Sequence, residues 1–268
     1  MVVRKSVYCF IIATIMSLLV VLIGCREIVP GFGPAVTGSG VLETREIDFS
    51  DFESIVVGSA FEAEITMADS YLVSITMDDN LFGHLQADQH ADTLHIGLEP
   101  NHTYVRTVKR VTITMPRLHE LKLSGASQAE VTGFSSSDTM EFDISGASDL
   151  DTDDVTAGDT SFEISGASHV SGDIEMADGR FNLSGASTVE LEGSANDVRV
   201  EASGASYARL FELSVFNVNF NLSGASRATI NASGRLDGDL SGASTLNYVG
   251  NPTLGDINTS GGSTISKR

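Results

Sequence analysis

The sequence predicts an all-β solenoid, a parallel β-helix with about 20 residues in each coil. The first observation is a tetrapeptide, Ser-Gly-Ala-Ser, that recurs through the second half of the chain and ends in an altered copy, Ser-Gly-Gly-Ser. Its copies begin 18 to 21 residues apart, at Ser124, Ser145, Ser165, Ser184, Ser203, Ser223, Ser241 and Ser260. Such a period is typical of a solenoid, in which each repeat buries its apolar face only by stacking on its neighbours.

The second observation is the alternation of apolar and polar residues on both sides of the tetrapeptide. Phe181 and Leu183 stand at alternate positions before one copy, and Val189 and Leu191 continue the pattern after it. A period of two indicates β-strands. One coil is therefore expected to hold two short strands around a corner of small residues, followed by a loop of variable length. Leucine-rich repeats have a similar period but need a framework of Leu and Asn that this repeat lacks.

Stacking in register turns each position of the repeat into a column. The aromatic column is expected to form a ladder of rings inside the helix, and it consists of Phe142, Phe162, Phe181 and Phe220, with Val200 in its gap. The Gly column either supplies a positive φ at the corner or allows a tight bend, and the pattern does not decide between these roles. The serines are expected to pass hydrogen bonds from coil to coil. Because the tetrapeptide makes every coil alike, we interpret it as architecture and not as an active site.

Residues 1–25 are predicted to be a lipoprotein signal peptide. Arg4 and Lys5 precede an uncharged apolar run, residues 7–23, and Leu22-Ile23-Gly24-Cys25 resembles a bacterial lipobox in which Cys25 is the lipidated residue. Acyl chains on this thiol would anchor the domain to a membrane. The alternative is an uncleaved membrane helix, because the apolar run is nearly long enough to span a bilayer.

The rest of the chain is expected to form three segments. Residues 26–40, rich in Gly and Pro, are predicted to be a flexible tether. Residues 41–123 alternate like strands without the regular tetrapeptide, and we expect degenerate N-terminal β coils or a cap in which strands pair differently. Within them, Gly58-Ser59-Ala60 resembles the later corner, and residues 81–85 are expected to form one helical turn. Residues 124–268 are predicted to be the regular β-helix.

Charge and cysteine content limit the classes of function. The chain has 36 acidic and 16 basic residues, a formal charge of −20, and loss of residues 1–24 with Arg4 and Lys5 would change this charge to −22. Such a balance disfavours nucleic acid and anionic lipid as partners and favours cations or a basic partner. The two cysteines, Cys9 and Cys25, both lie in the predicted signal peptide. The exported domain is therefore expected to have no disulfide.

Several segments resemble a known bacterial family. They follow the lipobox and a Gly-Ser-Gly start, in the order Phe49-Ser50-Asp51-Phe52-Glu53-Ser54-Ile55, Ala63-Glu64-Ile65-Thr66, Asp78-Asp79-Asn80-Leu81, Leu94-His95-Ile96, Thr112-Ile113-Thr114-Met115-Pro116 and Leu121-Lys122-Leu123-Ser124-Gly125-Ala126-Ser127. This order resembles the auto-transporter adhesin, head GIN domain family, over roughly residues 40–260. The resemblance implies a single-stranded right-handed parallel β-helix on the cell surface and a role in adhesion. It offers no catalytic or binding residue to carry over.

The candidate binding residues stand two positions before each tetrapeptide. This outward column comprises Asp143, Glu163, Asn182, Glu201, Asn221 and Asp239, preceded by Lys122 and followed by Asn258. Neighbouring coils would place Asp143 beside Glu163, and like charges opposed in a sheet destabilise it. One interpretation is a ligand face or a cation site, with Ca²⁺ as the candidate ion. The other is a solvated face whose Asn residues form an amide ladder. No metal ligand and no cofactor is assigned.

Two other polar clusters are interpreted as solvated surface. The acidic run Asp149-Leu150-Asp151-Thr152-Asp153-Asp154 is expected in a loop, and it lacks the Gly and the distal Glu of a calcium-binding loop. A histidine cluster follows no zinc-ligand spacing. Its members are His84, His90, His95 and His102, with Asp88 and Asp92 among them.

We expect a non-enzymatic, lipid-anchored protein of the cell envelope, facing the periplasm or the exterior, whose β-helix acts as an adhesion or binding surface. Its partner would be a surface ligand, either a glycan or an envelope protein. One alternative is an envelope structural or stress-signalling accessory protein. A less favoured one is a polysaccharide-active enzyme, because the repeats contain no Gly-x-Ser-x-Gly elbow and their basic residues are not expected to stack in line with acids. These residues are Arg180, Arg199, Arg209, Arg227 and Arg235.

Overall fold

The computed structural model describes residues 33–268, which fall into two units. The predicted signal peptide, its Cys25 and the first part of the predicted tether lie outside the described residues. In the first unit, β1 (Ala35–Thr37) pairs with β8 (Thr103–Val105), and the amide of Gly33 donates a hydrogen bond of 2.7 Å to the carbonyl of Asn101. The second unit, residues 37–99 and 106–268, is called the solenoid unit below.

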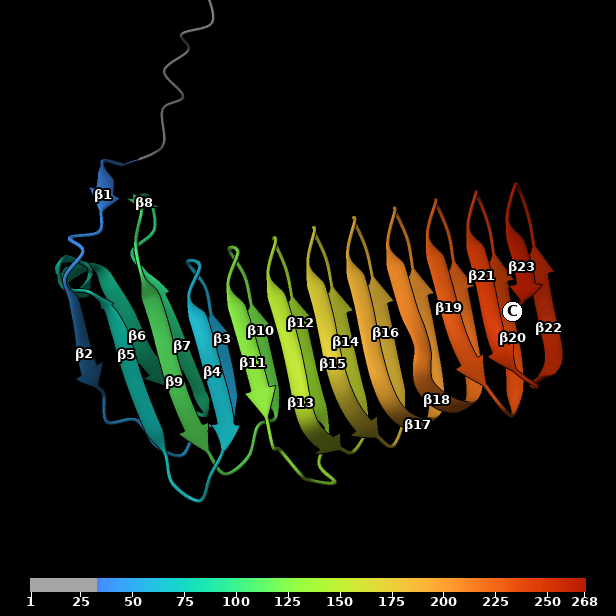
Figure 1. Cartoon of the computed structure of the whole chain (residues 1–268), viewed down its shortest axis with the longest axis horizontal. Coiled ribbons are helices and arrows are strands. Elements are labelled where there is room, and N and C mark those ends of the chain that lie inside the picture. Colours follow the sequence, from blue (N-terminus) through green and yellow to red (C-terminus); the bar gives the residue numbers. More distant parts are fainter. Residues whose placement is uncertain (1–32) are drawn as a thin grey trace, which may run out of the picture. The chain divides into compact units, whose positions relative to one another are not determined.

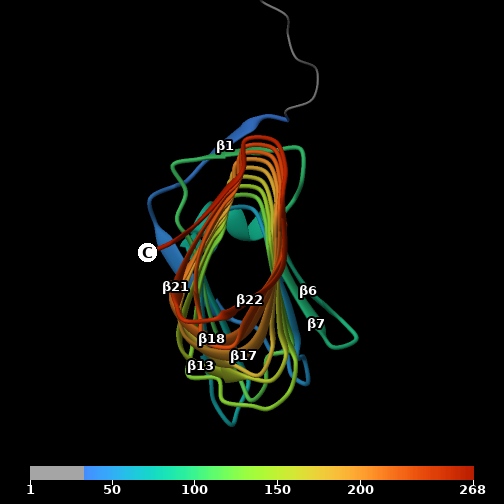
Figure 2. The same cartoon turned by 90° about the vertical axis from the view of Figure 1, so that its right-hand side faces the viewer.

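The solenoid unit is built from flattened coils that stack along one axis, so that two outward faces enclose a core (Figures 1 and 2). Face A consists, in order of pairing, of β2 (Leu42–Glu46), β5 (Leu72–Asp78), β9 (Lys109–Met115), β4 (Glu62–Met67), β11 (Gln128–Thr132), β13 (Asp149–Ala157), β15 (His169–Met176), the first parts of β17 (Thr188–Ala202) and β18 (Tyr207–Leu222), β19 (Arg227–Ala232), β21 (Thr245–Gly250) and β23 (Thr264–Lys267).

The strands of face B are also given in order of pairing. It consists of β6 (Leu85–His90), β7 (Thr93–Leu98), β3 (Ser54–Val57), β10 (Glu120–Leu123), β12 (Met140–Ile144), β14 (Thr160–Ile164), β16 (Gly179–Leu183), the second parts of β17 and β18, β20 (Arg235–Leu240) and β22 (Thr253–Thr259). From β3 and β4 onwards along the stack all pairing is parallel, and from β10 and β11 onwards the partners are about 20 residues apart. The predicted parallel β-helix is therefore confirmed.

Antiparallel strands close the N-terminal end of the stack. On face A, β2 pairs antiparallel with β5, and β5 pairs antiparallel with β9. On face B, β6 and β7 form an antiparallel hairpin that extends beyond the outline of the coils in Figure 2. A 3₁₀ helix, η1 (Asp79–His84), joins β5 to β6 where one helical turn was expected. The segment boundaries at residues 40 and 123 remain predictions.

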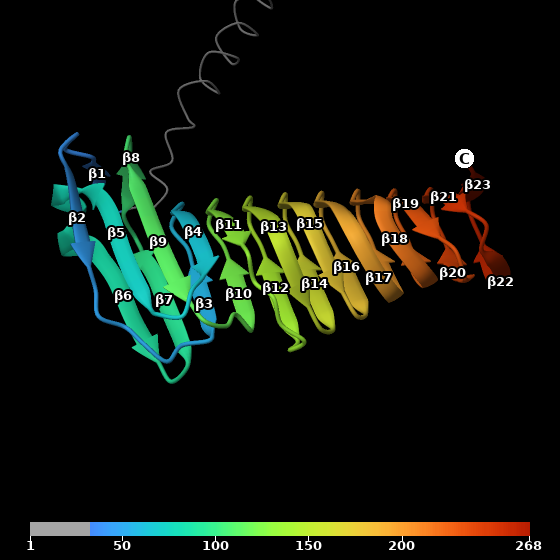
Figure 3. The ribbon, with the colours of Figure 1, turned by 60° about the horizontal axis from the view of Figure 1, so that its bottom comes forward.

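The coils differ most at the edge opposite the tetrapeptide corners. The sequence predicts a variable loop there in every repeat, but β17 and β18 continue from face A to face B without interruption over 15 and 16 residues (Figure 3). Register shifts absorb the extra residues, for example between Leu210 and Ser214 of β18 as it pairs with β19. The predicted loop is therefore wrong for these two coils, because bulged strands can change direction and keep their ladder.

The aromatic ladder forms as predicted. Phe142, Phe162, Phe181 and Phe220 are at most 1% exposed. The rings of Phe142 and Phe162 lie 5.0 Å apart at 16°, and those of Phe162 and Phe181 lie 5.0 Å apart at 5°. Val200 stands in register between Phe181 and Phe220, as expected. Stacked rings of this kind add about 0.5 to 1.5 kcal/mol per pair beyond the burial of their area.

The corner glycines combine both roles that the sequence left open. The Gly of every tetrapeptide has a positive φ, which is 74° at Gly185. A Cβ added to Gly185 would also stand 2.4 Å from the carbonyl oxygen of Gly166 in the coil before. That oxygen accepts a 2.8 Å hydrogen bond from the amide of Ala186. Glycine therefore allows both the bend and the backbone ladder that joins the corners, which form the upper edge in Figure 1.

The corner serines bond mainly within their own coil, in contrast to the expected chain of bonds between coils. The last Ser of the tetrapeptide is buried, and its hydroxyl donates to the carbonyl of the first Ser, at 2.9 Å from Ser168 to Ser165. Contacts of corner hydroxyls with the preceding coil are longer, such as 3.2 Å from Ser187 to the carbonyl of Ile164. Most of the connection between coils is made by the backbone.

A buried lysine completes the degenerate corner. Ser59 and Ala60 have φ values of 60° and 57°, like the 65° of Gly125 and Ala126 in the next coil, which confirms that Gly58-Ser59-Ala60 is a corner. Lys109 is 8% exposed, and its ammonium donates a hydrogen bond to the carbonyl of Ser59. Removal from water lowers the pKa of Lys109 below its ordinary value of 10.5.

The lowered pKa of Lys109 predicts a pH-dependent stability. Between the folded pKa and 10.5, the unfolded chain binds more protons than the folded one, so the free energy of unfolding contributed by this group rises as pH rises. Tyr71 acts in the opposite direction, since burial raises its pKa above 10.0. We therefore compare the wild type with Lys109→Met by urea unfolding from about pH 7 to about pH 10. The wild type is expected to gain stability relative to the variant as pH rises.

Lys267→Met is the matched control, because Lys267 is exposed on the last strand. This variant is expected to show the pH dependence of the wild type. If Lys109→Met also follows the wild type at every pH, burial does not perturb the pKa of Lys109.

No helix within residues 33–268 is both long and apolar enough to cross a membrane.

Candidate functional site

The predicted outward column is a continuous line on face B. Register pairs join Lys122 to Asp143, Asp143 to Glu163, and each later member to the next, through Asn182, Glu201, Asn221 and Asp239 to Asn258. From Glu163 onwards, acids and amides alternate along this line. Like charges therefore meet only once within the column, at Asp143 and Glu163.

Amides of the column donate to the acids of the preceding coil. The side-chain amide of Asn182 donates to the carboxylate of Glu163, and that of Asn258 donates to Asp239 Oδ1 at 2.9 Å. The expected ladder therefore forms in part, but it joins amides to acids instead of amides to amides. The other amide atom of Asn182, Oδ1, is the one buried side-chain polar atom in residues 33–268 that has no hydrogen-bond partner.

Basic residues from the neighbouring column hold Glu201. Arg199 Nε lies 2.7 Å from Glu201 Oε1, and Arg180 Nη2 lies 3.5 Å from the same oxygen. The hydrogen bond from Arg199 lowers the pKa of Glu201, and the charges of Arg199 and Arg180 act in the same direction. At the other end of the column, Lys122 pairs with Glu120 at 2.6 Å, which raises the pKa of Lys122; Asp143 adds to this effect. Among the acids of the column, Glu201 is therefore the one with arginine partners in residues 33–268.

A shallow groove of about 550 Å³ runs along the middle of this column. Its polar lining consists of Asp143, Glu163, Asn182, Glu201 and Asn221 with the corner serines Ser165, Ser184, Ser203 and Ser223. Asp239 is in line with these residues but outside the groove. Four neighbouring coils each supply a corner hydroxyl, and the column adds an acid or an amide from every coil that it crosses. The groove therefore presents hydrogen-bond donors and acceptors at a repeated spacing, roughly the 4.8 Å between strands.

The predicted acidic loop is a strand, which corrects the sequence-based interpretation. Residues 149–154 begin β13 on face A, where Leu150 and Thr152 point into the core while Asp149 and Asp151 face outwards. A bulge follows Thr152, and the amide of Asp154 donates to Asp173 Oδ1 at 2.5 Å. The strand could have been recognised from the sequence, because Asp149, Asp151 and Asp153 alternate with Leu150 and Thr152. A period of two is typical of a strand with one buried face.

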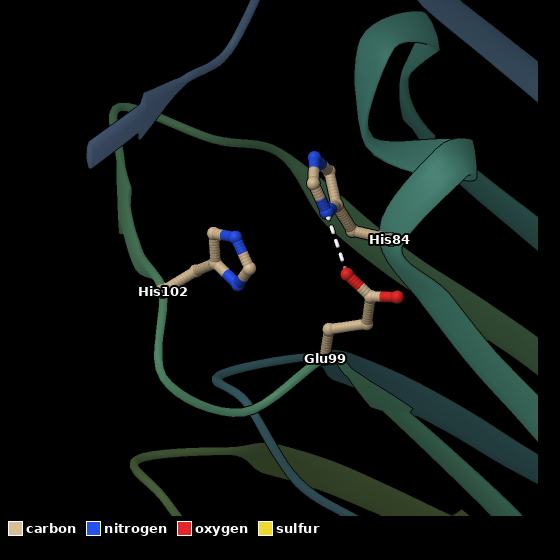
Figure 4. Close-up of side chains that lie close together, drawn as sticks. All are labelled: His84, Glu99 and His102. Atoms are coloured by element: carbon tan, nitrogen blue, oxygen red, sulfur yellow. Dashed lines mark hydrogen bonds and ion pairs between the residues drawn. The ribbon is translucent and has the colours of Figure 1, made fainter. Parts of the chain in front are cut away.

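The members of the histidine cluster belong to different elements, namely η1, the β6–β7 hairpin and the segment before β8. His84 Nδ1 at the end of η1 lies 3.0 Å from Glu99 Oε2 (Figure 4). On the β6–β7 hairpin, His90 Nε2 lies 2.7 Å from Asp88 Oδ2, and its ring centre is 5.8 Å from that of His95. His102 belongs to the first unit, and Asp92 lies in the turn of the hairpin, where its carbonyl accepts hydrogen bonds from the amides of Glu53 and Ser54.

The expectation that basic residues do not stack in line with acids is wrong. Arg209 stands in register with Glu190 and pairs with it at 3.0 Å. Arg180 and Arg199 follow Ser161 in the column that begins with Glu120 and Glu141. Each of these residues stands at a fixed offset from the first Ser of its tetrapeptide, four positions before it or six after it, so the sequence already contained the alignment.

Comparison with known proteins gives one family and several similar folds. Residues 51–252 match the family described as “Putative auto-transporter adhesin, head GIN domain”. No curated protein matches the sequence.

Several solved structures have a similar fold. A “Putative lipid binding protein” from Parabacteroides distasonis has a TM-score of 0.77 at 20% identity, and a “putative adhesin” from Parabacteroides merdae has 0.80 at 18%; each comparison covers 88% of this chain and 100% of the other. A “putative adhesin” from Bacteroides fragilis has a TM-score of 0.67 at 20% identity, over 87% and 100% of the two chains. At this identity the likeness shows the fold. The family match spans most of the chain, and the chain belongs to the auto-transporter adhesin, head GIN domain family.

Proposed function

We propose that this chain is a non-enzymatic adhesion protein of the bacterial envelope, and that the groove on face B binds a polyhydroxylated surface ligand, a glycan. The observation that carries the proposal is the groove of about 550 Å³ in which successive coils present the same kinds of groups. Carboxylates accept hydrogen bonds from sugar hydroxyls, and amides and serine hydroxyls both donate and accept. The buried Oδ1 of Asn182 adds an acceptor that lacks a donor.

Repetition compensates for weak individual contacts. Each coil offers a few polar side chains that are exposed to water. A hydrogen bond to such a side chain adds little to the free energy of binding. A polymer that engages several coils at once gains avidity, because each further contact forms at high effective concentration. The family to which the chain belongs supports this role, since its description names an adhesin.

The proposal includes display on a membrane through Cys25. Its support is the charged start, the apolar run and the lipobox-like end of residues 1–25. Acyl chains at this position would hold the solenoid unit at the envelope and leave face B open to a ligand.

The second candidate is an envelope accessory protein that binds a basic partner of its own cell. A groove of about 540 Å³ on face A favours it. The groove is lined by five carboxylates, those of Glu62, Glu64, Glu130, Asp149 and Asp151, and by one basic residue, Arg110, which pairs with Glu62 at 3.0 Å. Glu64, Glu130 and Asp151 stand in one column. A basic protein surface would relieve their mutual repulsion.

Binding of residues 33–268 to an array of polysaccharides and matrix proteins, with and without Ca²⁺, tests the adhesion proposal. We expect saturable glycan binding that Asn182→Ala weakens about tenfold, because the change removes a donor and an acceptor at the centre of the groove. Asn196→Ala is the matched control, since Asn196 is exposed in β17 and outside the groove.

Glycan binding that Asn182→Ala leaves unchanged would exclude the groove. Capture of a basic envelope protein, with no glycan bound, would favour the accessory role. Binding that requires Ca²⁺ would support the cation interpretation of Asp143 and Glu163.

A further inference from the structure

A second cavity lies on face A near the C-terminal end of the solenoid unit. Its volume is about 370 Å³, and it is formed by β17, β18, β19 and β21 with Arg268, which follows β23. We call it the arginine cavity. Its lining includes Glu190, Tyr207, Arg209, Phe211, Arg227 and Arg268. A site of this size can hold one or two sugar rings, and it lies at the small end of ordinary ligand sites.

The basic groups of this cavity are only partly neutralised. Arg209 pairs with Glu190 at 3.0 Å. Arg227 Nη1 donates to the hydroxyl of Tyr207 at 2.9 Å, and its guanidinium lies 5.4 Å from the centre of the Tyr207 ring. Within residues 33–268, neither Arg227 nor Arg268 has a carboxylate partner, although the chain has 36 acids and 16 bases. Two arginines without a carboxylate partner among the described residues therefore line one cavity of a strongly acidic protein.

An exposed aromatic ring borders these arginines. Phe211 is 42% exposed and belongs to the lining of the cavity, whereas the phenylalanines of the ladder are buried. Apolar ring surface that is exposed to water has an unfavourable free energy. A ligand with an apolar face would cover this surface, and an anionic group on the same ligand would pair with the arginines. An acidic sugar has both features, because its C–H face packs on a ring and its carboxylate matches the two-pronged guanidinium.

The charge of the whole chain argues against an anionic membrane as the ligand. A flat anionic surface would meet the excess of acids on both faces, whereas a single sugar inside the cavity meets the local arginines. We propose that the arginine cavity is a second site, separate from the groove on face B, that binds a carboxylate-bearing sugar unit of a glycan. In this site Arg227 and Arg268 bind the carboxylate, and Phe211 packs against the ring.

Calorimetric titration of the full chain in mild detergent tests this site. The probe is tetragalacturonate; its neutral methyl ester keeps the sugar without the charge, and inorganic phosphate supplies charge without a sugar. We expect saturable binding of tetragalacturonate, binding of the methyl ester at least about tenfold weaker, and a loss of roughly tenfold in Arg227→Gln. Phe211→Ala is expected to weaken the binding of tetragalacturonate and to leave the binding of phosphate unchanged.

Arg45→Gln is the matched control, because Arg45 is an exposed arginine of face A that lies outside the cavity. It is expected to bind like the wild type, and unchanged melting temperatures would show that all variants fold. Absence of tetragalacturonate binding, or binding that Arg227→Gln does not weaken, would overturn the proposal. Phosphate binding as tight as that of tetragalacturonate would overturn the assignment to a sugar. Asn182→Ala is expected to leave this titration unchanged, because the carboxylates of the groove on face B repel a polyanionic sugar. The two sites therefore fail or succeed separately.

Discussion

Gly185→Ala is expected to lower the free energy of unfolding of the solenoid unit by about 3 kcal/mol or more. The new Cβ would meet the carbonyl oxygen of Gly166 at 2.4 Å and its carbonyl carbon at 3.2 Å. These atoms belong to the backbone of the adjacent coil and cannot rotate away. The corner would have to separate from its neighbour, and the 2.8 Å hydrogen bond from Ala186 to that oxygen would lengthen or break. Urea unfolding measures the loss.

Gly133→Ala separates this clash from the cost of the backbone conformation. Gly133 has a φ of 76°, close to the 74° of Gly185, but a Cβ there would meet nothing within 4 Å. The left-handed conformation alone costs about 1 to 2 kcal/mol for alanine. Equal losses in the two variants would show that the corners do not depend on close contact between coils.

Phe162→Ala is expected to cost about 3 to 5 kcal/mol. Its ring is fully buried and stacks on Phe142 and Phe181, each at 5.0 Å, so the change removes apolar area and two ring contacts at once. The coils above and below are fixed by parallel ladders on face B and on face A, which prevents collapse into the cavity. The loss is read from the urea midpoint at constant slope.

Phe216→Ala is the control for the ladder. Phe216 lies on the same kind of coil but is 57% exposed, so its removal is expected to change stability by about 0.5 kcal/mol or less. A loss in Phe162→Ala no larger than this would mean that the stacked rings contribute little to stability.

Structural features that recur in every coil were predictable from the sequence, because the residue pattern that specifies them also recurs in every repeat. The phenylalanine ladder and the face B column follow from fixed offsets to the tetrapeptide, and any error at one copy is corrected by the others. The corner at Gly58 was also predictable, since Gly-Ser-Ala keeps the small residues that the bend requires. The corner glycines could not be assigned one role in advance, because conformation and close packing both favour glycine.

Features that occur once were not predictable in the same way. Nothing near Lys109 in the sequence indicates that its ammonium reaches Ser59, which lies 50 residues earlier. The passage of β17 and β18 from face to face depends on bulges, whose positions are set by contacts with neighbouring coils. The arginine cavity is likewise a local feature, formed where consecutive coils carry side chains that the other repeats lack. Its signal in the sequence was the departure of Tyr207 and Phe211 from the usual composition of the repeat.

The similarity of the tetrapeptide corners has a consequence for folding. A coil that can stack on one neighbour can stack almost as well on another, so a nascent coil can dock one repeat out of place and leave a whole repeat looped out. The antiparallel strands β2, β5, β6 and β7 have no counterpart among the repeats, and they mark one end of the stack unambiguously. Growth that starts from this end adds coils in chain order, and the N-terminal strands thereby act as the template that counts them.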